Sequence, residues 1–181
     1  MRKIIEYTLV SADGIVLDDT IAFQDYLDEA YLRDRLGVFE SCDAILMGRA
    51  TYERFVRTWA ERKPTRPYHQ RLVSMQKFVF SSKLASAEWG NAALVRGDVV
   101  AEIRRLKEQD GRDLLVLGHG LLGETLLEHR LLDGFDLTLH PILAGVGKGK
   151  PFLRPGQAAN LKLVATRGYS KLVKVSYELQ Y

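Results

Sequence analysis

Apolar and polar positions along the chain form short blocks that predict strands and helices in alternation. Short continuous apolar runs are typical of buried strands, and apolar residues spaced three and four apart are typical of helices that cover a core. The strand pattern covers residues 4–10, 44–47, 77–80, 93–96, 114–117 and 135–143. The helix pattern covers residues 23–39, 51–59, a segment from Val99 that stops at Gly111, and 124–132.

The last part of the chain has a different pattern. Residues 161–165 and 172–179 flank Arg167-Gly168, and the second segment alternates strictly between apolar and polar side chains. This alternation predicts an antiparallel hairpin. We therefore expect an α/β fold in one domain over residues 1–181, with a mostly parallel mixed sheet, flanking helices and a C-terminal hairpin.

Two local features complete the expected layout. Thr51 is a suitable N-cap for the helix that follows the second strand, and residues 61–67 form a charged loop with two prolines. The glycines at positions 145, 147 and 149 indicate either a lid or a plain loop between strands.

Composition narrows the class of protein. The chain has 181 residues, of which 46% are hydrophobic and 27% charged, as in ordinary globular domains. No apolar run approaches the ~20 residues of a membrane span. The first apolar stretch is interrupted by Glu6 and ends at residues 11–14, unlike a secretory signal. We therefore expect no membrane contact.

Cysteine and histidine usage argues against disulfide and metal chemistry. Cys42 is the single cysteine, so no intrachain disulfide can form and a cytoplasmic location is expected. The four histidines, at positions 69, 119, 129 and 140, are scattered without a metal-ligand spacing.

Basic residues concentrate in one part of the chain. The net charge is only +3, but residues 48–83 contain nine basic and two acidic side chains. This segment is either a solvated helix face or a local field that attracts a phosphorylated ligand. Aromatic side chains do not interleave with the basic ones, so we expect no nucleic-acid partner.

A glycine-rich turn follows the apolar strand at 114–117. Glycines stand at positions 118, 120 and 123, and a helical segment comes next. Backbone N–H groups at a helix start are unpaired and the helix dipole favours negative charge there, so such a turn can hold a phosphate. The same pattern also fits a plain structural turn.

Small, hydroxylated or basic residues follow several predicted strands. In a parallel sheet these carboxyl ends share one edge, where ligands bind. The glycine turns can hold the pyrophosphate of a dinucleotide. Hydrogen-bond donors for a further phosphate are present on Arg49, Thr51, Ser81 and Ser82. NADPH carries such a phosphate at its 2′ position and NADH does not, so these side chains favour NADPH. The acid that an NAD site would need is missing, because Asp136 stands at the start of its strand. An NAD-dependent Rossmann enzyme remains an alternative.

These segments together resemble a known family. The chain resembles the C-terminal reductase domain of the bifunctional riboflavin-biosynthesis deaminase-reductases (RibD), which has a dihydrofolate reductase-like fold. The resemblance covers nearly the whole chain and keeps its order. It is carried by residues 11–14, 44–53, 78–82, 118–120, 132–137 and 140–147.

The resemblance implies an NADPH-dependent reductase without the deaminase half, and it assigns roles to particular residues. Gly48, Arg49 and Thr51 would lie along the adenosine phosphates, and Ser81 and Ser82 would approach the 2′-phosphate. The glycine turn would hold the pyrophosphate, through Gly118, His119, Gly120, Leu121 and Leu122. For Arg49, a surface ion pair is the competing interpretation.

The chain departs from the family pattern at two places. His119 stands where glycine is expected in many relatives, and it could narrow the approach of the pyrophosphate. Dihydrofolate reductases carry a pterin-binding carboxylate on the first helix, and that spacing falls on Tyr31 and Leu32 here.

The implied reaction is hydride transfer to a carbonyl or imine carbon of a small heterocycle, similar to 5-amino-6-(5-phosphoribosylamino)uracil reduction. A proton must follow the hydride. Asp13 is the candidate donor, directly or through water, although an Asp in this turn also caps its own backbone. Tyr26, Leu27 and Tyr31 either line the substrate pocket or belong to the core.

Other functions remain open. The chain could instead reduce dihydrofolate or a pterin, or bind NADP(H) or a pterin without turnover. Relatives commonly form dimers, and the hairpin offers a free sheet edge or face, so we expect a homodimer.

Overall fold

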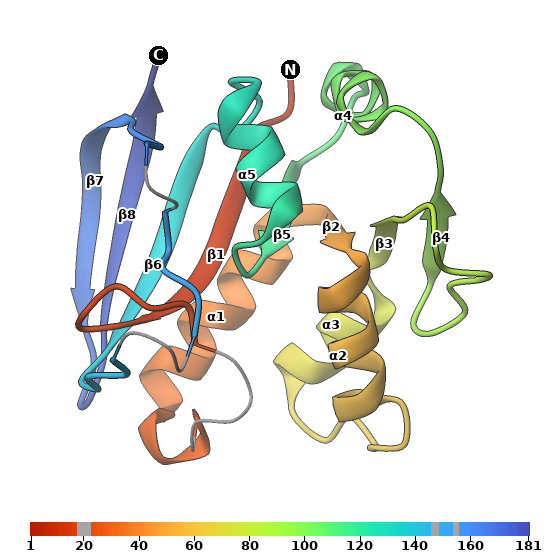
Figure 1. The fold of residues 1–181 in the computed structure, drawn as a ribbon. Helices are drawn as coiled ribbons and strands as arrows, with labels where there is room; N and C mark the ends of the chain where they lie inside the picture. Colours follow the sequence, from red (N-terminus) through yellow and green to blue (C-terminus); the bar gives the residue numbers. More distant parts are fainter. Residues whose placement is uncertain (18–22, 146–148, 154–155) are drawn as a thin grey trace.

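The structure is a computed structural model that describes residues 1–17, 23–145, 149–153 and 156–181. Within these residues the strands form one eight-stranded sheet with helices on both faces (Figure 1). The strands are β1 (Ile4–Ser11), β2 (Cys42–Gly48), β3 (Gln76–Phe80), β4 (Ala92–Val95), β5 (Asp113–Leu117), β6 (Gly134–His140), β7 (Asn160–Gly168) and β8 (Val173–Gln180). The helices are the 3-10 helix η1 (Phe23–Tyr26), α1 (Glu29–Ser41), α2 (Arg49–Trp59), α3 (Pro67–Ser74), α4 (Val99–Glu108) and α5 (Leu121–Glu128).

The strand order across the sheet is β4-β3-β2-β5-β1-β6-β8-β7. Every neighbouring pair from β4 to β6 is parallel, whereas β8 runs antiparallel to both β6 and β7. This confirms the predicted mixed sheet with a C-terminal antiparallel hairpin. The carboxyl ends of six strands therefore lie along one edge.

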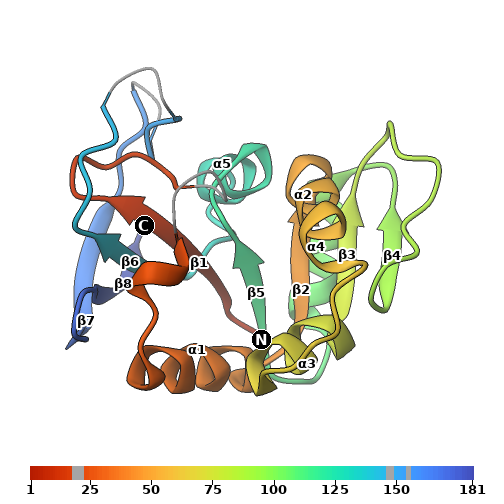
Figure 2. The ribbon, with the colours of Figure 1, turned by 90° about the horizontal axis from the view of Figure 1, so that it is seen from below.

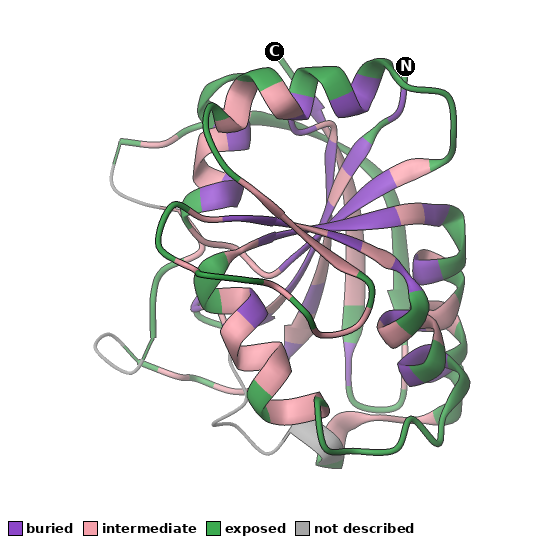
Figure 3. Ribbon diagram, turned by 90° about the vertical axis from the view of Figure 1, so that its right-hand side faces the viewer, coloured by how far each residue is buried: buried purple, intermediate pink, exposed green. Residues whose placement is uncertain are grey.

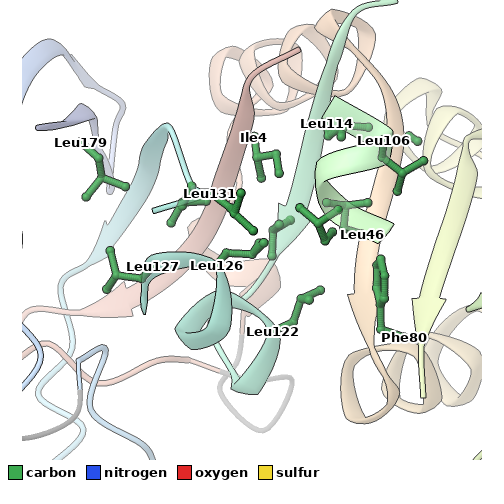
Figure 4. Close-up of a cluster of buried hydrophobic side chains, with 14 of the residues drawn as sticks. Ile4, Leu46, Phe80, Leu106, Leu114, Leu122, Leu126, Leu127, Leu131 and Leu179 are labelled. Carbon is green, nitrogen blue, oxygen red and sulfur yellow. The ribbon is translucent and has the colours of Figure 1, made fainter. Parts of the chain in front are cut away.

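Hydrophobic side chains fill the space on both faces of the sheet. In β5, Leu114 and Val116 point to the face covered by α4 and α5, and Leu115 and Leu117 point to the face covered by α1 and α3. Figure 2 shows α1 and α3 together on one side of the sheet. In Figure 3 burial follows the central strands, while the outer sides of the helices are exposed. Figure 4 shows the cluster that Leu122 and Leu126 of α5 form with these strands.

The helix predicted over 23–39 is interrupted. The structure has η1 at its start and then α1, which ends two residues later than predicted. Asp28 causes this division, because its carboxylate accepts a 2.7 Å hydrogen bond from the backbone N–H of Tyr31 and caps α1.

Other elements also differ from the prediction. The N-cap of α2 is Gly48 rather than Thr51, and α5 begins at Leu121 rather than Glu124. Helix α3 directly follows the predicted loop and was not expected. It begins at Pro67, a residue whose fixed φ suits the first helical position. In the predicted glycine-rich loop, residues 146–148 lie outside the described part of the chain.

Candidate functional site

The parallel strand ends bring the predicted phosphate-binding residues to one edge of the sheet. Ser81 follows β3, Gly48 ends β2, Gly118 follows β5 and Ser11 ends β1. Because these strands are neighbours in that order, the four positions follow one another along the edge. Three strand spacings separate the first from the last, about 14 Å at ~4.8 Å each. The edge is thus suited to an extended ligand.

Two helix starts meet at the middle of this edge. The N-cap residues of α2 and α5 are Gly48 and Gly120, and neither helix start has a side-chain cap. A Cβ atom added to Gly48 would lie 3.9 Å from the Cβ of Leu122 in the first turn of α5, so the two starts adjoin. Uncapped N–H groups and two helix dipoles favour an anion between them.

Gly118 and Gly120 have different structural roles in the turn before α5. Gly118 has φ +72°, a left-handed conformation that side chains rarely adopt, and its N–H donates to the carbonyl of Tyr7 (2.9 Å). Gly120 is extended (φ −169°), and no heavy atom lies within 4 Å of where its Cβ would be. Gly118 therefore shapes the turn, whereas Gly120 leaves the start of α5 uncovered.

The side chain of His119 points into the protein. It is 3% exposed, its Nδ1 lies 2.8 Å from Oε1 of the fully buried Glu6, and its ring centroid is 4.8 Å from that of Phe152. The expectation that His119 narrows the approach to the turn is therefore wrong. Only its backbone faces the turn.

Arg49 and Thr51 belong to the first turn of α2. Both carboxylate oxygens of Glu53 accept 3.0 Å hydrogen bonds from Nη1 of Arg49, and the Arg49 side chain is 45% exposed. The surface ion pair expected as the competing interpretation is thus present. Thr51 is half-buried at the third position of the helix.

Ser81 and Ser82 begin the loop after β3. The hydroxyl oxygen of Ser81 accepts from the N–H groups of Lys83 and Leu84 (both 3.1 Å), which leaves its proton available to a ligand. The carbonyl of exposed Ser82 accepts from Arg96 at the end of β4 (3.3 Å). Arg96 was missed in the sequence, because only the β3–β4 pairing brings it here.

Asp13 lies at the β1 end of the edge. Its carboxylate accepts hydrogen bonds from the Ser11 hydroxyl (2.5 Å) and from the N–H groups of Gly145 (2.8 Å) and Ala144 (3.0 Å). These bonds, that of Ser11 above all, lower the pKa of Asp13 to about 2. Asp13 is therefore ionised at neutral pH, and direct proton donation, still a prediction, is disfavoured.

The three predicted substrate-contacting residues separate in the fold. The ring of Tyr26 packs edge-on against His140 at the end of β6, with centroids 5.5 Å apart, and Leu27 is half-buried against the α1-side core. Tyr31 is fully buried, and its hydroxyl lies 2.5 Å from that of Tyr7. This position disfavours contact between Tyr31 and a substrate.

His140 is a buried titratable side chain at the end of β6. It is 1% exposed, its Nδ1 lies 3.2 Å from the carbonyl of Thr138, and burial lowers its pKa. Its pairing with Ser11 across β1 and β6 places it beside the Asp13 loop. The carboxyl ends of β1 and β6 thus have three candidate side chains beside them, those of Asp13, Tyr26 and His140.

The sequence profile of the RibD C-terminal domain matches residues 2–175. The chain belongs to this family. Two proteins of Bacillus subtilis (strain 168) are similar to this chain in sequence, YyaP and YwjB, and both are uncharacterized. YyaP is 29% identical over 174 residues, which cover 91% of this chain and 82% of YyaP, and YwjB is 25% identical over 180 residues, covering 97% of each.

Solved structures share the fold. A Shewanella sp. PV-4 protein with the provisional name riboflavin biosynthesis protein has a TM-score of 0.73 at 21% identity, covering 99% of both chains. A pyrimidine reductase-like protein of Corynebacterium diphtheriae has a TM-score of 0.66 at 13% identity, covering 99% of this chain and 92% of its own. Acinetobacter baumannii RibD has a TM-score of 0.65 at 12% identity, and the match covers 100% of this chain and 59% of that protein.

Membrane-spanning helices and metal-binding clusters were not expected from the sequence. Among them, no helix is long and apolar enough to cross a membrane. The same residues contain no group of three or more His, Cys, Asp or Glu side chains that could hold a metal ion.

Proposed function

We propose that this RibD-family domain is an NADPH-dependent reductase of a small pyrimidine- or pteridine-like heterocycle. The observation that carries the proposal is the pair of uncapped helix starts that adjoin at Gly48 and Leu122, in the middle of the strand-end edge. The resemblance to the RibD reductase domain implies NADPH as the hydride source, and the match of residues 2–175 to that family supports this part of the proposal. The proposal includes a cytoplasmic location for the enzyme.

The residues along the edge fit the parts of a dinucleotide. The N–H groups at Leu121 and Leu122 would bind the pyrophosphate, and the open space at Gly120 allows its approach. Arg49, Thr51, Ser81 and Ser82 would bind the adenosine side with its 2′-phosphate. When bound, NADPH supplies a hydride to the substrate.

Asp13, Tyr26 and His140 would orient the substrate at the other end of the edge. Since the pKa of Asp13 is lowered to about 2 and burial lowers the pKa of His140, neither side chain is a strong proton donor at neutral pH. We infer that the proton is delivered through a water molecule that the Asp13 carboxylate orients.

Folate reduction is the second candidate activity. The fully buried residues of α1 are Tyr31, Leu32, Arg35 and Phe39, and none of them carries a carboxylate. Asp28 caps the helix, and Asp34 pairs with Lys174 and Arg167. This arrangement favours a substrate other than a folate.

The test combines binding and turnover. Wild-type protein is titrated with NADPH and NADH, and NADPH oxidation is followed by absorbance with 5-amino-6-(5-phosphoribosylamino)uracil, dihydrofolate and a simple pterin. Preferential NADPH binding with oxidation by the pyrimidine supports the proposal. Oxidation only with dihydrofolate supports the alternative substrate, and binding without oxidation supports a non-catalytic module. Absence of NADPH binding overturns the proposal.

A matched pair of glycine variants adds a structural control. Gly118→Ala and Gly156→Ala both place a side chain at a positive φ, +72° and +88°, but only Gly118 belongs to the turn at α5. We expect Gly118→Ala alone to weaken NADPH binding. Equal loss in both variants would indicate general destabilisation instead.

A further inference from the structure

Arg54 places a guanidinium at the glycine turn. It lies on α2, six residues after the Gly48 cap, and its Nη2 is 3.5 Å from the position that a Cβ on Gly118 would take. The side chain is half-buried, its Nε is fully buried, and the guanidinium carbon lies 5.9 Å from the centre of the Phe55 ring. Arg54 thus links α2 to the turn that precedes α5.

The other arginines of α2 have different positions. Arg49 is paired with Glu53 at the exposed start of the helix, and Arg57 is exposed in its last turn. Of the three, Arg54 is the one whose guanidinium lies beside Gly118. Its spacing from the Gly48-Arg49 step carries no motif, so the sequence alone did not single it out.

The surroundings of Arg54 suit a pyrophosphate. A guanidinium offers a planar fork of N–H donors that matches phosphate oxygens bidentately and remains charged at all ordinary pH values. The adjoining starts of α2 and α5 provide backbone N–H groups beside it. An anion at this point would contact main-chain donors and one side-chain cation together.

We propose that Arg54 binds the pyrophosphate of the dinucleotide at the Gly118–Leu122 turn. The inference rests on the proposed function, since it assumes a dinucleotide at this edge. Both NADPH and NADH contain the pyrophosphate, so Arg54 contributes equally to the affinity for each. It therefore has a different signature from Arg49 and Ser81, which would contact the 2′-phosphate of NADPH alone.

The experiment compares Arg54→Ala, Arg54→Lys and the matched control Arg57→Ala with the wild type. Each protein is titrated with NADPH, NADH and adenosine 2′-monophosphate, a probe that has the 2′-phosphate but no phosphate at the 5′ position, where the pyrophosphate begins. Loss of a charge-assisted hydrogen bond predicts Kd increases of about tenfold to a hundredfold for NADPH and NADH in Arg54→Ala. The affinity of Arg54→Ala for adenosine 2′-monophosphate and all affinities of Arg57→Ala should stay near wild type. The dinucleotide affinities of Arg54→Lys should be intermediate.

Several outcomes would overturn the assignment. They are wild-type NADPH affinity in both Arg54 variants, weakening of NADPH without NADH, and equal weakening of adenosine 2′-monophosphate. Thermal unfolding without ligand shows whether Arg54→Ala is folded. If it is not folded, the titrations of Arg54→Lys test the assignment instead. If wild-type protein binds neither dinucleotide, the proposed function fails as well. If it binds NADPH and the variants bind equally well, only the role of Arg54 fails.

Discussion

Glu6 and His119 form a buried pair directly beneath the glycine turn, with 2.8 Å between Oε1 of Glu6 and Nδ1 of His119. Glu6 is fully buried on β1 and also accepts a 3.0 Å hydrogen bond from the hydroxyl of Thr8. A residue from the first strand thus fixes a residue 113 positions later in the chain. The pair anchors the turn from inside the protein and leaves its outer side open.

Removing one member of this pair should cost much of the stability of the fold. His119→Ala leaves the buried carboxyl group of Glu6 without the hydrogen bond to His119, and we expect a loss of about 1–3 kcal/mol. Urea unfolding of the wild type and of the His119→Ala variant measures this loss of stability. The double variant Glu6→Gln/His119→Ala should lose less than the sum of the single variants, because the two side chains contact each other directly. Simple additivity would contradict a coupled pair.

Gly123 should be intolerant of even one added methyl group. A Cβ there would overlap Oε2 of Glu6 and lie 2.9 Å from Nδ1 of His119. We expect Gly123→Ala to destabilise the protein by about 1–3 kcal/mol through overpacking. The matched control is Gly37→Ala on α1, where nothing lies within 4 Å and alanine should stabilise by roughly 0.5–1 kcal/mol. Denaturant midpoints that fall in both variants would argue against this explanation.

Arg49→Ala should weaken NADPH binding far more than NADH binding. We expect about a tenfold or greater increase in the NADPH Kd from the lost contact with the 2′-phosphate. Stability should change by less than about 1 kcal/mol, since the Arg49–Glu53 pair is largely exposed. Arg105→Ala removes a comparable exposed pair with Glu102 on α4 and serves as the control. Equal losses for NADPH and NADH would rule out a 2′-phosphate contact.

Asp13 should contribute to the acid stability of the fold. Its folded-state pKa of about 2 lies below the ordinary value of 3.8, so its contribution is present above pH 4 and is lost as the pH falls toward 2. Asp13→Asn should reduce the drop in the urea midpoint between pH 5 and pH 2.5. Asp28 has a similarly lowered pKa and remains in the variant, so some acid sensitivity persists. An unchanged pH profile would contradict the ionised Asp13 contacts.

We propose that two copies of the chain pair through the C-terminal hairpin. Every residue of the edge strand β7 is exposed, and the aligned pairs Leu161–Leu179 and Leu163–Tyr177 place apolar side chains on one face of β7 and β8. Light scattering should show a dimer for the wild type and a monomer for Leu163→Glu. Leu143→Glu, at a position 80% exposed elsewhere, should remain dimeric. A wild-type monomer would exclude the proposal.

Much of this protein could be predicted from local sequence. The apolar runs that become β1, β2 and β5 are largely buried. Their alternation with helical segments along the chain favours parallel strands covered by helices. The alternation from Val173 to Leu179 identified the hairpin. The residues after these strands were predicted to meet because parallel strand ends share an edge, and β3, β2, β5 and β1 are neighbours in the structure.

Only the tertiary structure decided where individual side chains point. The sequence contained Glu6, His119 and Arg54 without any sign that the first two form a pair or that Arg54 reaches Gly118. These contacts depend on the order of strands in the sheet and on the angle at which α2 and α5 leave it. Local patterns determine which residues form strands and helices because backbone geometry repeats over a few residues. Contacts between segments far apart in the chain have no such period, so they appear only when the whole fold is assembled.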